Sequence, residues 1–149
     1  MLLKDVYTSD VVCCGRDATV MEVARLLRNR HTGDVVVVDD PDVERIPAGL
    51  ITDRDIVVRV LGAGLDPHQV TAGQVMCTPL VSASESEDTS QAITRMRTHG
   101  VRRLPVTGTG GSLVGIVTLD DLLRLLLGDA NALLDSVARE QDLERRRVR

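Results

Sequence analysis

The residues best suited to binding chemistry form a motif that occurs twice, Gly-aliphatic-aliphatic-Thr-x-x-Asp. It reads GLITDRD at residues 49–55 and GIVTLDD at residues 115–121. A carboxylate one turn into a helix can accept hydrogen bonds from both hydroxyls of a ribose, and the free N–H groups of a helix start attract anions such as phosphate. The glycine leaves room for a close approach to the strand end. The motif is therefore a candidate ligand site.

The same spacing also has a purely structural interpretation. In a helix-capping box, Thr is the N-cap residue and the acidic side chain three positions later accepts a hydrogen bond from the backbone of the cap. A single Thr-x-x-Asp favours this interpretation. Two copies at matching points of the chain, Thr52 with Asp55 and Thr118 with Asp121, favour a binding role.

Each motif ends one copy of an internal repeat. Residues 5–38 recur as residues 74–107, so residue 5 corresponds to residue 74, an offset of 69 positions. A doubled supersecondary unit predicts one architecture made of two similar halves. Because a half of roughly 60 residues buries little core alone, we expect the halves to pack face to face with pseudo-two-fold symmetry.

Each copy is predicted to follow the order β-α-β-β-α, an α+β fold. The first helices begin at capping boxes, Thr19 with Glu22 and Asp88 with Gln91. The aliphatic strands that follow lack alternation, which predicts burial on both faces. The predicted strands are 35–38, 104–106, about 48–52 and about 113–118, and the second helices about 53–61 and 119–127. We divide the chain into repeat 1 (1–66), repeat 2 (67–130) and a helical or basic tail (131–149).

Composition excludes several classes of function. The net charge of −4 opposes general nucleic-acid binding, which needs a clustered basic surface. The single aromatic residue, Tyr7, excludes an aromatic stacking platform. No apolar run approaches the ~20 residues that span a bilayer, and the N-terminus lacks a signal-peptide profile. We therefore expect a cytoplasmic protein without a membrane or nucleic-acid partner.

Cysteine and histidine are sparse and scattered. Cys13, Cys14 and Cys77 are interpreted as small apolar residues, and the three histidines lack metal-ligand spacing to them or to one another. We therefore expect no metal site. A redox-responsive module built on these cysteines is the weakest functional hypothesis, because none has an electropositive neighbour in sequence to lower its pKa.

The predicted last helix is unusually apolar. It carries Leu122, Leu123, Leu125, Leu126 and Leu127, which cover more of the helix circumference than one core-facing stripe requires. Burial on two sides within the chain is one explanation. A self-association surface is favoured, because a monomer would otherwise expose a large apolar patch. We therefore expect a homodimer, with a solvated basic cluster at 145–149.

Together, the repeat, the sequence HGVRRLPV at 99–106 and the Gly-x-x-Thr-x-x-Asp endings closely resemble a tandem pair of CBS (cystathionine-β-synthase) domains over about residues 2–128. The stretch 49–67 further resembles short stand-alone bacterial CBS-pair proteins. The resemblance implies a sensor module that binds AMP, ADP, ATP or S-adenosylmethionine between its repeats and dimerises through its helices.

The resemblance also implies two clefts, each combining the Thr and Asp of one repeat with strand residues of the other. Cleft one would comprise Leu50, Ile51, Thr52, Asp55, Val81, Arg102, Arg103 and Pro105. Cleft two, the weaker site, would comprise Val12, Gly33, Asp34, Val35, Ile116, Thr118 and Asp121. In cleft one, Asp55 would hold the ribose and Arg103, with Arg102, would face a phosphate.

The clefts differ in charge at one equivalent position. Asp34 stands in copy one where Arg103 stands in copy two. At an effective dielectric constant of about 20, two charges about 4 Å apart interact by about 4 kcal/mol, enough to abolish micromolar binding of a phosphate. We therefore predict asymmetric occupancy, with cleft one working and cleft two empty or tuned to an uncharged adenosine moiety.

The leading hypothesis is a non-catalytic regulatory module for an adenosine-containing ligand, with no further cofactor and an unidentified downstream protein target. The sequence pairs no nucleophile with a base, and the repeated acids suit binding better than proton transfer. The alternative hypothesis is a protein-interaction or assembly module with vestigial clefts, which the leucine-rich helix and basic tail would serve.

Overall fold

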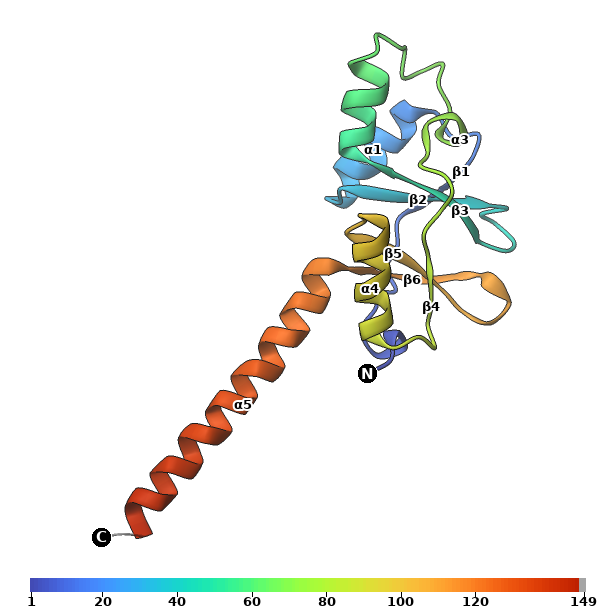
Figure 1. Cartoon of the computed structure of the whole chain (residues 1–149). Helices are drawn as coiled ribbons and strands as arrows, with labels where there is room; N and C mark the ends of the chain where they lie inside the picture. Colours follow the sequence, from blue (N-terminus) through green and yellow to red (C-terminus); the bar gives the residue numbers. More distant parts are fainter. Residues whose placement is uncertain (148–149) are drawn as a thin grey trace.

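The computed structural model describes residues 1–147, with side chains at all of these except 140–142, 144, 145 and 147. Val148 and Arg149 of the basic cluster lie outside the described residues. The described part has two three-stranded sheets, each with one long helix of its own repeat beside it (Figure 1). The predicted α+β class and β-α-β-β-α order are confirmed in both halves.

The elements of the two halves follow one another in the same order. The first half contains η1 (Leu3–Asp5), β1 (Cys13–Gly15), α1 (Val20–Arg30), β2 (Asp34–Asp39), β3 (Ile46–Thr52), α2 (Asp53–Asp55) and η2 (Ile56–Leu61). The second half contains α3 (Ala72–Val75), β4 (Ala83–Ser84), α4 (Thr89–His99), β5 (Arg103–Thr107), η3 (Thr109–Gly111), β6 (Leu113–Thr118) and α5 (Leu119–Arg147). The predicted helix at 53–61 begins as α2 and continues as the π-helical turns of η2.

Each sheet has a parallel and an antiparallel pair. β1 runs parallel to β2, and β2 runs antiparallel to β3. The second sheet repeats this with β4, β5 and β6. The four central residues of β2 are buried, which confirms that this strand is covered on both faces. Both predicted capping boxes are present, at Thr19 for α1 and Asp88 for α4.

The first segment of each repeat packs onto the other repeat. Leu3 is fully buried in the core of the second half, and its N–H donates to the carbonyl of Glu87 at 2.8 Å. Conversely, Ala72, Val75 and Met76 belong to the core of the first half. The N-terminus accordingly lies in the half that holds α4, and α3 lies in the half that holds α1 (Figure 1). This exchange joins the two repeats into one unit.

A third cluster of buried side chains lies between the two sheets. Val36 and Val38 of β2 pack there with Leu113 and Ile116 of β6. The hairpins are also linked, because the N–H of Leu113 donates to the carbonyl of Arg45 at 2.7 Å. The sheets therefore pack face to face as predicted, and the start of β6 is fixed against the first repeat.

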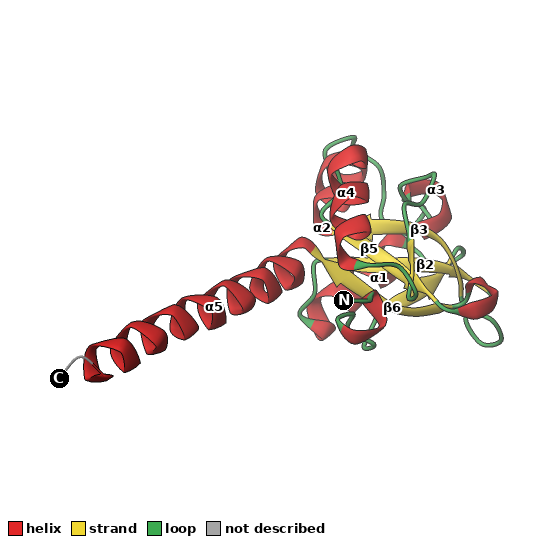
Figure 2. Cartoon of the chain, turned by 60° about the horizontal axis from the view of Figure 1, so that its bottom comes forward, coloured by secondary structure: helices red, strands yellow, loops and turns green. Residues whose placement is uncertain are grey.

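Helix α5 is much longer than the helix predicted at 119–127. It runs unbroken from Leu119 to Arg147, through Gly128, and leaves the rest of the molecule as a rod (Figure 1, Figure 2). At a rise of 1.5 Å per residue, it is about 43 Å long. Leu122, near its start, is buried in the second core. None of the helices in the described part of the chain is both long and apolar enough to cross a membrane.

The glycine that begins each Thr-x-x-Asp motif makes room for a side chain of the other repeat. A Cβ at Gly49 would lie 2.5 Å from Sδ of Met76, and one at Gly115 would lie 2.1 Å from Cδ2 of Tyr7. Tyr7 and Met76 are equivalent under the repeat offset. The close approach expected at these strand ends is therefore made by the protein itself.

Gly115→Ala is expected to destabilise the fold. The added methyl group would meet the Tyr7 ring and also the carbonyl oxygen of Thr8 at 2.8 Å, and backbone atoms cannot move aside cheaply. Overpacking of this kind costs about 1–3 kcal/mol, which lowers the melting temperature by about 2–4 °C per kcal/mol for a chain of this size.

Thermal unfolding followed by circular dichroism measures the change. Gly128→Ala, which meets nothing within 4 Å, is the control and should not lower the melting temperature. Equal melting of Gly115→Ala and the wild type would contradict the packing argument.

Candidate functional site

The motif at the start of α5 is held by three short contacts. Oδ2 of Asp121 accepts hydrogen bonds from the backbone N–H of Thr118 at 3.1 Å and from its hydroxyl at 2.7 Å. The N–H of Asp121 donates to Oγ1 of Thr118 at 3.1 Å. The capping interpretation is therefore correct, and it fixes the carboxylate at the end of β6. The second oxygen, Oδ1, accepts no hydrogen bond from the described side chains and remains available to a ligand.

This carboxylate lies in the wall of a cavity of about 200 Å³ between the two repeats. The lining residues from the first repeat are Thr8, Asp10, Val11, Val12, Arg30, Thr32 and Asp34, and those from the second are Ile116, Thr118 and Asp121. Five residues predicted for cleft two are among them. The other two lie elsewhere: Val35 is fully buried in the first core, and the carbonyl of Gly33 accepts a hydrogen bond from the N–H of Asp53.

Cleft two contains residues that sequence reasoning missed. Thr8 joins the end of β6 through two backbone hydrogen bonds with Ile116, at 2.9 and 3.0 Å. Arg30 donates to Asp10 at 2.6 Å, and both side chains are exposed at the cavity. The internal repeat could have indicated these residues. In each copy, the segment that precedes the first strand packs against the Thr-x-x-Asp motif of the other copy.

The equivalent place in cleft one has the same backbone geometry. Oδ2 of Asp55 accepts hydrogen bonds from the N–H of Thr52 at 2.8 Å and from its hydroxyl at 3.0 Å. Cys77 takes the position of Thr8: its N–H donates to the carbonyl of Leu50 at 2.9 Å, and its thiol lies 3.7 Å from Oδ2 of Asp55. Arg59 contacts the same sulfur at 3.8 Å. Cys77 and Arg59 were both missed by sequence reasoning.

The remaining residues predicted for cleft one are only partly accessible. Ile51 and Pro105 are buried, and Val81 packs against the second core. Arg102 is exposed and lies 3.6 Å from Asp120 at the start of α5. Leu50 is half-buried beside the cluster between the sheets. The side chains that a ligand can reach at this end of the molecule therefore include Thr52, Asp55 and Cys77.

Asp34 and Arg103, assigned to separate clefts by the sequence, form an ion pair with each other. Nε of Arg103 lies 3.2 Å from Oδ2 of Asp34. Their side chains are 16% exposed for Asp34 and 30% exposed for Arg103. Burial raises the pKa of Asp34, and Arg103 opposes that rise. The carboxylate in cleft two thus has a counter-charge that the sequence comparison did not foresee.

Two CBS domain matches, at residues 3–62 and 72–128, cover most of the chain and coincide with the two halves. The chain belongs to the CBS-domain family. Its two halves form a CBS pair, and the cavity of cleft two lies between them.

Two relatives and one solved structure are similar to this chain. Hypoxic response protein 1 of Mycobacterium tuberculosis is 35% identical over 83% of this chain and 83% of its own length. A crystal structure of Hypoxic Response Protein I with two coordinated zinc ions has a TM-score of 0.74 at 33% identity, over 83% of this chain and 98% of that one. An uncharacterised protein of Methanopyrus kandleri is 35% identical over 81% of this chain, and the match spans only 60% of that longer protein.

One solved structure shows a CBS pair with adenosine ligands. The CBS domain pair of protein MJ0100, in complex with 5′-methylthioadenosine and S-adenosyl-L-methionine, has a TM-score of 0.74 at 25% identity. The match covers 87% of this chain and 98% of that one. Among the described residues, no three His, Cys, Asp or Glu side chains lie together in a way that could hold a metal ion.

Two of the three cysteines have thiol pKa values that disfavour redox chemistry. Burial, with Cys13 and Glu22 contributing, raises the pKa of Cys14 to about 11. Burial and the Asp55 carboxylate also raise the pKa of Cys77, although its side chain is exposed. Because the thiolate is the reactive form, the CBS pair holds both thiols in the unreactive form at neutral pH.

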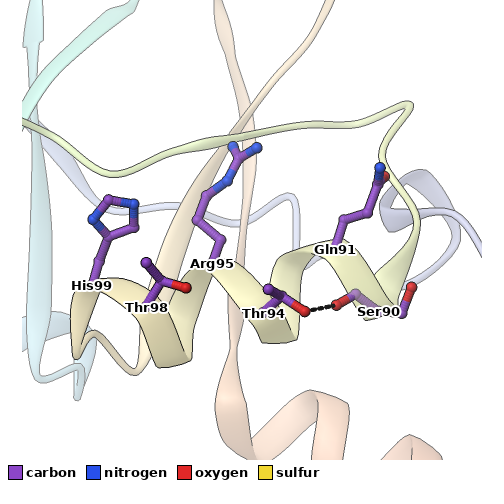
Figure 3. A pocket seen from close by; sticks show the side chains of 6 residues that line it. All are labelled: Ser90, Gln91, Thr94, Arg95, Thr98 and His99. Atoms are coloured by element: carbon purple, nitrogen blue, oxygen red, sulfur yellow. Dashed lines mark hydrogen bonds between the residues drawn. The ribbon is translucent and has the colours of Figure 1, made fainter.

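A second hollow lies along α4, away from both motifs. It has a volume of about 370 Å³ and is lined by Ser90, Gln91, Thr94, Arg95, Thr98 and His99 (Figure 3). Every one of these residues belongs to a single helix. Arg95 is already engaged, with Glu87 at 3.0 Å and with the carbonyl of Ser82. The hollow is a surface groove on one helix, whereas residues of both repeats line cleft two.

Proposed function

We propose that this CBS pair is a non-catalytic regulatory module that binds an adenosine-containing ligand between its repeats. The observation that carries the proposal is Asp121, whose Oδ2 is fixed by Thr118 while the carboxylate lines the interrepeat cavity. A pre-oriented carboxylate suits the paired hydroxyls of a ribose, because hydrogen bonds to a charged acceptor are the stronger ones. The 5′-methylthioadenosine and S-adenosyl-L-methionine complex of protein MJ0100 supports the ligand class.

The size of cleft two indicates how a ligand enters it. A volume of about 200 Å³ is below the roughly 300–1,000 Å³ of typical small-molecule pockets. The cleft must therefore widen, and the pair of Arg30 and Asp10 is the part best able to move, with side chains 46% and 80% exposed. Both side chains reach solvent, so the pair can turn outward without separating its two charges.

Cleft one is proposed as the site for a phosphate-bearing ligand such as AMP, ADP or ATP. Asp55 is fixed as Asp121 is, and the repeat offset gives Arg103 the place that Asp34 has in cleft two. An Arg guanidinium suits a phosphate because it offers several donors in a fixed plane. In both clefts the Asp carboxylate is engaged by its capping Thr, an arrangement that supports binding rather than proton transfer.

Isothermal titration calorimetry of the full chain with AMP, ADP, ATP and S-adenosylmethionine tests the proposal. We expect micromolar binding of at least one of them, and a rise in melting temperature that grows with ligand concentration. Adenine without ribose is the matched control and should bind far more weakly, since the Asp contacts require the sugar. Absence of heat and of any thermal shift with all four ligands would contradict the proposed function.

A second proposed function, self-association, rests on the exposed face of α5. Its large apolar side chains, Leu123, Leu126, Leu127, Leu133, Leu134 and Val137, are between 46% and 69% exposed. Leu119, Leu123, Leu126, Ala130, Leu133 and Val137 recur at alternating spacings of four and three, the seam of a coiled coil. Such a seam is buried by another helix of the same kind, and we propose a second copy of α5 as that helix.

Charge favours an antiparallel arrangement of the two copies. Within α5, residues 119–135 contain four Asp against one Arg, and residues 136–147 contain four Arg against three acidic residues. An antiparallel contact of the two helices therefore sets the net negative end of one against the net positive end of the other. The antiparallel alignment of the two helix dipoles is also electrostatically favourable. The proposed assembly is a homodimer joined along α5.

A further inference from the structure

The ion pair of Asp34 and Arg103 lies between the two Thr-x-x-Asp motifs. Asp34 is the strand partner of Thr52, and Arg103 is the strand partner of Thr118. Asp34 also lines cleft two, and the repeat offset gives Arg103 the equivalent place in cleft one. Asp34 thus lines cleft two, and Arg103 is the residue proposed to meet a phosphate in cleft one.

This pair is held by charge without a well-formed hydrogen bond. Nε of Arg103 is 3.2 Å from Oδ2 of Asp34, but the nitrogen is buried and makes no hydrogen bond within the described part of the chain. A buried guanidinium N–H without a partner is costly, and an anionic oxygen with better geometry relieves that cost. A phosphate in cleft one can therefore compete with Asp34 for Arg103.

We propose that Asp34 and Arg103 couple the two clefts, so that a phosphate-bearing adenosine ligand in cleft one makes cleft two prefer an adenosine ligand with a cationic 5′ group. When a phosphate engages Arg103, Asp34 loses its counter-charge. Cleft two then carries the uncompensated Asp34 beside Asp121, since Arg30 is already paired with Asp10. The proposal rests on the proposed function and adds a rule for which ligands occupy the clefts together.

Thermodynamic linkage makes the coupling reciprocal. If AMP in cleft one tightens the binding of S-adenosylmethionine in cleft two, S-adenosylmethionine must tighten AMP by the same factor. S-adenosylmethionine is the suitable probe because its sulfonium and ammonium groups are cationic. Coupling between two sites in one protein is typically 5–150-fold, and we expect about tenfold here because the pair remains partly exposed to solvent.

Calorimetric titration of S-adenosylmethionine into the full chain, with and without saturating AMP, measures the coupling. We expect AMP to lower the dissociation constant about tenfold and S-adenosylmethionine to do the same for AMP. Asp34→Asn should bring that ratio to one, because the amide carries no charge to uncover. Asp39→Asn, at the other end of β2 and paired with Arg16 at 2.5 Å, is the matched control and should keep the tenfold ratio.

Three results of these titrations would overturn the coupling. They are a ratio of one in the wild type although each ligand binds alone, weaker binding of one ligand in the presence of the other, and a tenfold ratio that survives in Asp34→Asn. The first leaves the proposed function intact, whereas failure of both ligands to bind alone removes the function and the coupling together.

Should Asp34→Asn fail to fold, judged by its melting curve, the exchanged variant Asp34→Arg with Arg103→Asp decides. The exchange restores the ion pair with its charges reversed, so the arginine then lines cleft two. AMP should bind there, and its affinity should fall in Asp121→Ala instead of Asp55→Ala. AMP binding that stays sensitive to Asp55→Ala would overturn the coupling.

Discussion

Asp121→Ala is expected to weaken binding of S-adenosylmethionine in cleft two by about 100-fold, a loss of about 2.7 kcal/mol. The carboxylate would accept hydrogen bonds from two ribose hydroxyls, and hydrogen bonds to a charged group contribute about 1.5–3 kcal/mol each. Because Oδ2 already accepts two hydrogen bonds from Thr118, a second ribose bond adds little, and a total near that of one bond is expected. Calorimetry with the full chain gives the dissociation constant directly.

The same variant also tests the structural role of Asp121. Its Oδ2 accepts hydrogen bonds from the N–H and hydroxyl of Thr118, and loss of a cap typically costs about 1 kcal/mol. Asp120→Ala removes the neighbouring acid, whose side chain is 69% exposed, and controls for the charge at the helix start. It should change the dissociation constant by less than about twofold, in keeping with the small effects of exposed charges. Full affinity in Asp121→Ala would show that the motif is a cap and nothing more.

Much of the fold could be predicted from local sequence signals. The capping boxes at Thr19 and Asp88 depend on residues three positions apart, and both are present. The buried run of β2 followed from its unbroken aliphatic sequence. Helix caps and buried strands depend on residues within one helical turn or one strand. A single copy of the repeat is therefore enough to predict them, and the second copy shows the same pattern.

Features that depend on how the halves meet could not be predicted in the same way. The sequence places Asp34 and Arg103 at equivalent positions but says nothing about their distance, which depends on the packing of β2 and β5 across the symmetry axis. Likewise, the glycines at 49 and 115 indicated a close approach, but the group that approaches, Met76 or Tyr7, comes from the exchanged first segment of the other repeat.

The end of the last helix was misjudged for a different reason. The sequence predicted a helix at 119–127 and a separate helical or basic tail from residue 131, but a glycine inside a helix, here Gly128, costs only about 1 kcal/mol relative to alanine. The residues that follow, ANALL at 130–134, are mostly strong helix formers, so the helix continues to Arg147. This continuation turns a short core helix into a rod with an exposed apolar seam.

Leu133→Lys is expected to abolish self-association at micromolar concentration. Leu133 lies in the part of α5 beyond the CBS match, is 69% exposed in the single chain, and belongs to the proposed coiled-coil seam. Burying a leucine stabilises by about 1.5–3 kcal/mol, and a symmetric dimer buries two, so the variant should raise the dissociation constant at least 100-fold. Sedimentation velocity over a range of protein concentrations measures it.

A lysine two positions before Leu133 tests whether the loss of the dimer comes from the seam or from the added charge alone. Asn131→Lys adds the same charge to α5 outside the spacing of four and three, and it should leave the dimer intact. Raised salt should weaken the wild-type dimer moderately, because an antiparallel pair sets the acidic half of one helix against the basic end of the other. Leu133 lies far along α5 from both clefts, so Leu133→Lys should retain ligand binding. Loss of ligand binding together with the dimer would show that the clefts depend on the assembly, whereas an unchanged dimer in Leu133→Lys would remove α5 as the interface.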